Sequence, residues 1–175
     1  MLWITGLSGS GKTTLAQNLI PRFAAENLRP ILLDGDSIRE VLGVNSENSN
    51  DFSRKKRLEL ALRYSKLSKV LSEQGFIVVV ATISMFSEVY RWNRENLENY
   101  FELLLNVPIE ELTRRDSKGI YSRFARGELR QVAGLDLHVD LPQEPDFILE
   151  PDLGGLNQTQ EFDLFAKLLE FFVRG

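Results

Sequence analysis

The sequence predicts a three-layer α/β fold in which helices cover both faces of a five-stranded parallel sheet. Five short apolar runs are continuous rather than alternating in polarity, which is typical of strands buried on both faces. Helical patterns separate these runs, and such alternation indicates a parallel sheet with right-handed crossovers. The expected strands are residues 2–5, 31–34, 76–83, 101–107 and 146–150.

The helices are expected between the strands and at the end of the chain. The segment 55–75 places Leu60, Tyr64, Leu67 and Leu71 on one apolar stripe. Further helices are expected over 88–100, 109–116 and 159–175. The aromatic side chains of the last helix are expected in the core: Phe162, Phe165, Phe171 and Phe172.

Two long stretches, 42–53 and 118–145, fit neither pattern. The first is polar, and the second begins with basic residues and continues irregularly. Loops of this length in a compact domain are usually functional or mobile. We therefore expect them to border a site, with a lid over about 115–134.

The composition indicates one domain, 1–175, with 43% hydrophobic residues and therefore a sizeable core. The chain has no cysteine, which excludes disulfides, zinc-thiolate sites and cysteine nucleophiles. A net charge of -4 argues against a nucleic-acid polymer as partner. The first ten residues do not read as a signal peptide, and the longest apolar run, 76–83, is too short to span a membrane. We expect a cytoplasmic protein with no membrane partner.

The segment 6–14 reads GLSGSGKTT and matches the complete P-loop pattern between an expected strand and an expected helix. Its glycines let successive main-chain N–H groups surround a β-phosphate, and the following helix adds its positive end. Lys12 is expected between the β- and γ-phosphates of ATP, and the Thr13 hydroxyl on Mg²⁺. The predicted nucleotide-binding residues of this loop are Gly6, Ser8, Gly9, Ser10, Gly11, Lys12, Thr13 and Thr14.

Other features narrow the class of P-loop protein. No Asn-Lys-x-Asp segment that would read guanine is present, and the third expected strand does not end in the acidic residue of a motor ATPase. A basic lid that excludes water suits a small-molecule kinase instead.

The expected acceptor side follows the second strand, where LLDGDSIRE spans 32–40. Asp34 and Asp36 stand at the carboxyl end of a parallel strand, where α/β sheets form their sites. Asp36 is expected to orient or deprotonate an acceptor hydroxyl, or to hold Mg²⁺ through water, and Arg39 to bind an anionic group. The alternative for Asp36 is the N-cap of a helix, a position that aspartate favours.

Five segments together, GLSGSGKTTLA, LLDGDSIR, DFSRKKR, ATIS and RRDSKGIYSRFARGEL, resemble adenylyl-sulfate kinases in order and context. The resemblance covers nearly the whole chain, and its second and last segments are its most specific parts. It implies transfer of the ATP γ-phosphoryl group to the ribose 3′-hydroxyl of a 5′-modified nucleotide. It also implies Mg²⁺, a doubly wound sheet and a homodimer.

The resemblance also implies roles for single residues. Asp36 is similar to the family's catalytic or magnesium-associated aspartate, and the lid residue Lys118 to a lysine that reaches the phosphates of both substrates. Arg115 is close to the donor-nucleotide contact region. The implied acceptor-binding set is Asp34, Arg39, Phe52, Arg57, Ile83 and Ser84.

Departures from the family pattern gather on the acceptor side. Leu60 stands where the family has an acceptor-binding asparagine, and Val132 where it has the phenylalanine that pairs with Phe52 around adenine. Loss of one stacking face removes about 1–3 kcal/mol. The segment ATISMFSEVYRWNREN resembles the family's cytidine diphosphoramidate kinase branch, which acts in capsule-phosphoramidate pathways and whose smaller base needs the second aromatic ring less.

Three alternatives remain open at the level of sequence. The first is a genuine adenylyl-sulfate kinase. The second is a non-catalytic nucleotide sensor, against which the intact lid argues, and the third an ATPase coupled to conformational work. Within the lid, Arg123 or Arg126 is expected to grip phosphate, whereas His138 is interpreted as a loop residue.

Overall fold

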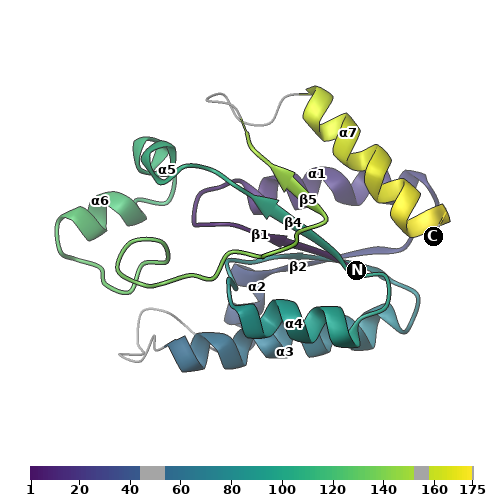
Figure 1. Cartoon of the computed structure of the whole chain (residues 1–175), viewed down its shortest axis with the longest axis horizontal. Coiled ribbons are helices and arrows are strands. Elements are labelled where there is room, and N and C mark those ends of the chain that lie inside the picture. The colour runs from purple at the N-terminus through teal and green to yellow at the C-terminus, as the bar shows by residue number, and fades with distance from the viewer. Residues whose placement is uncertain (44–53, 152–157, 175) are drawn as a thin grey trace.

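The computed structural model describes residues 1–43, 54–151 and 158–174. These residues form a five-stranded sheet in the order β2-β3-β1-β4-β5, and every neighbouring pair of strands is parallel (Figure 1). The strands are β1 (Leu2–Thr5), β2 (Pro30–Asp34), β3 (Ile77–Ala81), β4 (Phe101–Leu105) and β5 (Phe147–Leu149). The predicted five-stranded parallel sheet is therefore confirmed.

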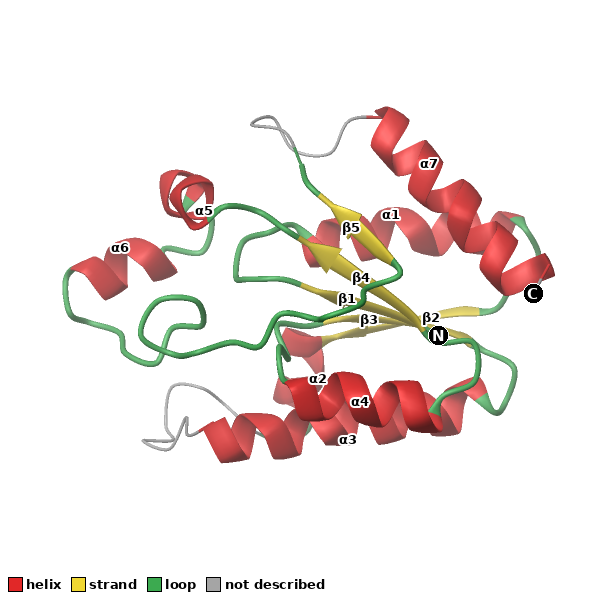
Figure 2. Ribbon diagram, in the orientation of Figure 1, coloured by secondary structure: helices red, strands yellow, loops and turns green. Residues whose placement is uncertain are grey.

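Helices cover both faces of this sheet, so the predicted three-layer architecture is also confirmed. Figures 1 and 2 show α1 and α7 on one face and α3 and α4 on the other. The helices are α1 (Lys12–Ala25), α2 (Gly35–Val41), α3 (Arg54–Ser72), α4 (Ser87–Asn96), α5 (Ile109–Arg115), α6 (Ile120–Ala125) and α7 (Gln158–Leu169), continued by the π-helical turn η1 (Glu170–Arg174).

The strand order places β1 at the centre of the sheet, between β3 and β4. All strands are parallel, so the carboxyl ends of β1, β2 and β3 meet at one edge. Helices α5 and α6 lie beyond the same edge (Figure 1). Segments far apart in the sequence thus converge where ligands bind in open α/β sheets.

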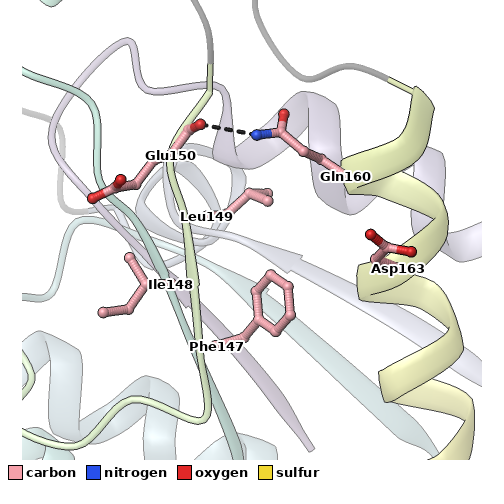
Figure 3. Close-up of a pocket in the computed structure, with 6 residues that line it drawn as sticks. All are labelled: Phe147, Ile148, Leu149, Glu150, Gln160 and Asp163. Carbon is pink, nitrogen blue, oxygen red and sulfur yellow. Dashed lines mark hydrogen bonds between the residues drawn. The ribbon is translucent and has the colours of Figure 1, made fainter.

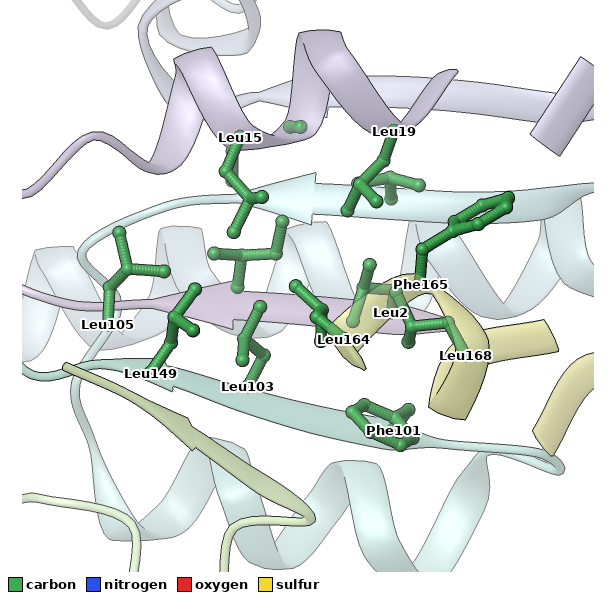
Figure 4. Close-up of a cluster of buried hydrophobic side chains, with 14 of the residues drawn as sticks. Leu2, Leu15, Leu19, Phe101, Leu103, Leu105, Leu149, Leu164, Phe165 and Leu168 are labelled. Carbon is green, nitrogen blue, oxygen red and sulfur yellow. The ribbon is translucent and has the colours of Figure 1, made fainter. Parts of the chain in front are cut away.

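Alternation along the strands divides the core that packs on the sheet into two clusters, one on each face. Leu2 and Ile4 of β1 face α1 and α7, whereas Trp3 faces α3 and α4. The first cluster is drawn in Figure 4 and unites strand residues with one stripe of each covering helix. Its most deeply buried members include Leu2, Ile4, Leu15, Leu19, Phe23, Leu103, Leu164 and Leu168.

Two apolar side chains, one from the expected stripe on 55–75 and one from the C-terminal aromatic set, are more exposed than the sequence predicted. Leu67 on α3 is 41% exposed and Phe162 on α7 is 67% exposed. Phe165 is buried, and Phe171 and Phe172 are partly buried against the first cluster, as predicted. Spacing groups residues on a broad face of a helix, but a sheet covers only the part of that face that touches it.

A cavity of about 430 Å³ lies between β5 and α7. Figure 3 shows its wall, where Gln160 Nε2 donates to the carbonyl oxygen of Glu150 at 3.0 Å and Asp163 lies further along α7. Of the described residues that line this cavity, none belongs to the predicted site. Among the helices that the structure describes, none is long and apolar enough to cross a bilayer.

Candidate active site

The loop between β1 and α1 forms the phosphate-binding half of the site. The strand ends at Thr5 and the helix begins at Lys12, so the glycines between them turn the chain. Gly6 has φ 153°, and a Cβ atom there would lie 2.6 Å from the Leu105 carbonyl oxygen. Only glycine permits this close approach. The loop therefore directs main-chain groups and the start of the 14-residue α1 toward one space.

Lys12 is buried within this loop and is bonded to its oxygen atoms. Its Nζ donates to the Leu7 carbonyl oxygen at 2.7 Å and to Ser10 Oγ at 3.3 Å. Burial, followed by the positive charge of Lys118, lowers the pKa of Lys12 to about 7, while the Asp34 carboxylate acts in the opposite direction. An anionic phosphate beside Nζ favours the charged form, so the residue is suited to pair with a polyphosphate.

Asp34 joins the phosphate loop to the end of β2. Its Oδ2 accepts a hydrogen bond from the Thr13 hydroxyl at 2.7 Å. Its Oδ1 accepts the main-chain N–H groups of Asp36 at 3.0 Å and Ser37 at 3.4 Å, which makes Asp34 the N-cap of α2. The alternative that Asp36 caps this helix is therefore wrong, because β2 runs to Asp34 and α2 begins at the next residue.

Asp36 lies in the first turn of α2 and contacts the lid. Its Oδ2 accepts a hydrogen bond from Lys118 Nζ at 2.8 Å, and its Oδ1 pairs with Arg39 one turn along the helix. The side chain remains 58% exposed. The two aspartates after β2 thus have separate partners, since Asp34 contacts the phosphate loop through Thr13 and Asp36 contacts the lid.

Arg57 in the first turn of α3 forms another side of this space. Its Nη2 donates to the Gln131 carbonyl oxygen at 2.9 Å. Burial and, after it, the positive charge of Arg39 lower the pKa of Arg57. Positive charge exceeds negative charge among the predicted site residues placed here, which suits anionic substrates. The cations are Lys12, Arg39, Arg57 and Lys118, and the carboxylates are Asp34 and Asp36.

Ile83 and Ser84 follow β3 at the same edge of the sheet. The Thr5 hydroxyl at the end of β1 donates to the Ile83 carbonyl oxygen at 2.9 Å. Ser84 is buried, and its Oγ lies 2.9 Å from Thr82 Oγ1. The structure thus brings this segment beside the phosphate loop, while its contact with an acceptor stays a prediction.

The lid is joined to the phosphate loop by Tyr121, a residue that the sequence analysis missed. The buried Tyr121 hydroxyl donates to the Ser8 carbonyl oxygen at 2.8 Å, and burial raises the pKa of Tyr121 to about 12. The Asp116 carboxylate accepts the main-chain N–H groups of Tyr121 at 2.9 Å and Ser122 at 3.0 Å in the first turn of α6. An aromatic residue in a basic loop carries no sequence signal that its hydroxyl will meet a distant carbonyl.

The lid arginines pair with acidic neighbours. Arg115 Nε donates to Glu111 at 2.6 Å within α5. Arg126 Nε donates to Glu128 at 2.6 Å, and Arg123 lies 3.8 Å from the same carboxylate. Their expected contacts with phosphate therefore stay predictions, and each would require these ion pairs to rearrange.

Leu60 and Val132, which depart from the family pattern on the acceptor side, are both described by the structure. Phe52 lies outside the described residues. Leu60 is partly buried and packs against the second core cluster, and Val132 is 7% exposed. Leu60 therefore offers no amide where the family pattern has an asparagine, and Val132 offers no aromatic ring where it has a phenylalanine. His138 is 84% exposed and lies 3.2 Å from Asp140, in agreement with its interpretation as a loop residue.

Comparison with known proteins decides the family. The family model described as adenylylsulphate kinase matches residues 1–150. The chain belongs to the adenylylsulphate kinase family. It is accordingly a P-loop kinase and an ATP-dependent phosphotransferase, as the sequence predicted.

Relatives within the family have different substrates in their names. The cytidine diphosphoramidate kinase of Campylobacter jejuni is 40% identical over 169 residues, which are 97% of this chain and 95% of the relative. The adenylyl-sulfate kinase of Picosynechococcus is 35% identical over 169 residues, 97% of this chain and 93% of the relative. Overall likeness therefore supports the family without confirming the acceptor.

A solved structure supports the fold and the use of ATP. The APS kinase CysC of Mycobacterium tuberculosis in complex with AMPPNP and APS superposes with a TM-score of 0.84 at 31% identity, covering 97% of this chain and 96% of that chain. A hexameric APS kinase from Thiobacillus denitrificans, at 21% identity and a TM-score of 0.63, covers 97% of this chain and 28% of that chain and supports the fold alone.

Proposed function

We propose that this kinase transfers the γ-phosphoryl group of ATP to the ribose 3′-hydroxyl of cytidine diphosphoramidate. The observation that supports phosphoryl transfer to a hydroxyl group is that the two aspartates after β2 have different partners. Asp34 accepts the Thr13 hydroxyl of the phosphate loop at 2.7 Å, and Asp36 accepts the lid residue Lys118 at 2.8 Å. ATP and the acceptor can thus meet between Asp34, on the side of the magnesium ion, and Asp36, on the side of the acceptor hydroxyl.

Mg²⁺ fits the residues on the donor side. It prefers oxygen ligands and keeps several waters, and the Thr13 hydroxyl together with the Asp34 carboxylate offers such oxygens. When bound there it would neutralise charge on the β- and γ-phosphates. The Thr13 hydroxyl donates a hydrogen bond to Asp34, which leaves the lone pairs of the hydroxyl oxygen available for the ion. Asp36, which the sequence also suggested for the metal, has its described side-chain contacts with Lys118 and Arg39 instead.

The protein's own residues perform the remaining steps. Lys12 pairs with the transferred phosphoryl group, and its low pKa in the free protein rises as phosphate approaches. Lys118 lies close enough to Lys12 for its charge to lower that pKa, so it can turn from Asp36 to the phosphates. Asp36 then accepts a hydrogen bond from the 3′-hydroxyl, aligns it for in-line attack and takes its proton.

Two lines of argument favour a cytidine nucleotide as the acceptor. A relative named cytidine diphosphoramidate kinase matches 97% of this chain at 40% identity. Leu60 and Val132 also lack the amide and the ring that the family pattern uses for adenylyl sulfate. A missing hydrogen bond costs about 0.5–1.5 kcal/mol and a missing stacking face about 1–3 kcal/mol. Together these losses correspond to roughly two orders of magnitude in affinity.

The test is a comparison of kcat/KM for cytidine diphosphoramidate and adenylyl sulfate with ATP and Mg²⁺. We expect the cytidine nucleotide to be preferred by at least about tenfold, and product analysis to locate the new phosphate on the 3′-oxygen. Equal or better turnover of adenylyl sulfate would refute the cytidine assignment and establish the alternative, an adenylyl-sulfate kinase. ATP binding without turnover of either nucleotide would instead favour a sensor.

Asp36→Asn is the control for the mechanism. The amide keeps the size of the side chain but cannot take the hydroxyl proton, so turnover should nearly vanish while ATP binding persists. Unchanged turnover would remove Asp36 from the mechanism. We further expect a homodimer from the family resemblance and a cytoplasmic location from the sequence, which sedimentation and cell fractionation can test.

A further inference from the structure

Residues 131–137, at the end of the lid, form a turn whose main-chain groups are hydrogen-bonded to one another. The N–H of Gly134 donates to the Leu137 carbonyl oxygen at 3.0 Å. The N–H groups of Leu135 and Leu137 both donate to the Val132 carbonyl oxygen, at 3.0 and 3.1 Å. These bonds make the turn compact and rigid, so a contact that holds one of its residues also restrains the others.

Asp136 fastens the entrance of this turn. Its carboxylate accepts the main-chain N–H of Gln131 at 2.8 Å and that of Val132 at 2.6 Å. Gln131 has φ 57°, a left-handed conformation that is unfavourable for a residue with a side chain. The hydrogen bond from Gln131, with that from Val132, lowers the pKa of Asp136, so the charged carboxylate is the form that holds the turn.

The turn contacts both halves of the candidate active site. The Gln131 carbonyl oxygen accepts Arg57 Nη2 at 2.9 Å, which ties the turn to α3. On its other side Gly134 lies against the phosphate loop, because a Cβ atom there would come within 2.8 Å of the Leu7 side chain. The same unit therefore touches an arginine of the acceptor side and a residue of the donor side.

The bond to Gln131 also helps to hold the guanidinium group of Arg57 in place. Burial and, after it, the positive charge of Arg39 lower the pKa of Arg57, while the Asp136 carboxylate acts in the opposite direction. The guanidinium groups of Arg39 and Arg57 are therefore close enough to repel each other. A bound anion between them would relieve this repulsion. A carbonyl oxygen that fixes Arg57 near Arg39 thus prepares an anion site before the substrate arrives.

We propose that Asp136 is a positioning residue for the acceptor nucleotide, which acts by holding the 131–137 turn and through it Arg57. The inference rests on the proposed function, because it requires the acceptor anion to bind beside Arg57. Asp136 acts on Arg57 in two ways, through the Gln131 residue that it holds and through its own negative charge, which opposes the lowering of the pKa of Arg57. Without Asp136 the Gln131 carbonyl oxygen is no longer held in place, so the Arg57 side chain is more mobile in the free enzyme. Arg57 then loses more conformational entropy when the acceptor binds.

Steady-state kinetics of five variants, one of them Arg57→Ala alone, tests this inference. The acceptor is whichever of cytidine diphosphoramidate and adenylyl sulfate the unmodified enzyme phosphorylates. Asp136→Ala should raise the acceptor KM by about tenfold and leave the KM for ATP within about twofold. Asp136→Asn keeps one accepting oxygen and should give an intermediate KM. In an Arg57→Ala background Asp136→Ala should add less than about twofold, because both changes remove one linked interaction. Asp163→Ala, an exposed carboxylate on α7, should change neither KM.

The outcomes separate the inference from the proposed function. A lower kcat with an unchanged acceptor KM in Asp136→Ala would indicate a merely structural role and overturn the inference. Equal effects of Asp136→Ala with and without Arg57 would also overturn it. Absence of turnover with both nucleotides in the unmodified enzyme would refute the proposed function and the inference with it. If Asp136→Ala fails to fold, the graded change in Asp136→Asn decides.

Discussion

Replacing Lys12 by Met should change the pH dependence of stability in a predictable way. Lys12 is 8% exposed, and its pKa falls from 10.5 to about 7, first because of burial and then because of the charge of Lys118. Between these two values the folded protein binds fewer protons than the unfolded chain. Stability therefore rises as the pH increases from 7 toward 10.5, and the full penalty applies below pH 7. Methionine has a similar length and no charge, so it removes this contribution.

The size of the effect follows from the two pKa values. Each pKa unit corresponds to about 1.4 kcal/mol, so the shift of Lys12 destabilises the folded protein by on the order of 4–5 kcal/mol at pH 7. Raising the pH from 7 to 9 should recover roughly 2 kcal/mol. The buried amino group of Met1, whose pKa falls to about 5, contributes a gain of its own. That gain is common to both proteins and cancels in their difference.

The assay is urea unfolding of the unmodified protein and Lys12→Met at pH 7 and pH 9, with chelator and without nucleotide. The unmodified protein should gain roughly 2 kcal/mol more than the variant between the two pH values. Lys12→Met should also be the more stable protein at pH 7, although it loses activity. Equal gains in the two proteins would refute the argument that burial keeps Lys12 partly neutral.

Three further changes test the contacts around the phosphate loop. Gly134→Ala should lower the free energy of unfolding by about 1 kcal/mol more than Gly75→Ala, since φ is 84° and 82° but only the first Cβ would meet Leu7; equal losses would contradict this. Tyr121→Phe should cost about 1 kcal/mol and raise the KM for ATP, and two unchanged values would argue against the lid contact. Asp34→Asn should raise the Mg²⁺ concentration for half-maximal activity by about tenfold, whereas an unchanged requirement would exclude Asp34 from the metal side.

The fold was largely predictable because its signals are local. Continuous apolar runs identified all five strands, with differences of at most two residues at their ends. The P-loop was recognisable because the close approach of Gly6 to Leu105 admits no side chain, and this requirement is visible in the sequence as glycine. Leu67 and Phe162 were misjudged because periodicity does not say how wide a stripe the sheet covers.

The contacts within the site were less predictable because they join segments far apart in the sequence. Asp36 meets Lys118 across 82 positions, and Tyr121 meets Ser8 across 113. Asp34 and Asp36 are nearly equivalent in the sequence, yet the start of α2 makes only Asp34 its cap and turns Asp36 toward the lid. No local pattern distinguishes these partners.

By itself the sequence determined the layered fold, the phosphate loop, the class of reaction and the family, since each depends on periodicity or on residues that one local backbone shape requires. Only the tertiary structure decided that Asp34 contacts the phosphate loop and Asp36 the lid, how the lid meets the phosphate loop, and that Asp136 holds the turn beside Arg57. The physical reason is the strand order, which places β1 between β3 and β4 and gathers distant side chains at one edge of the sheet.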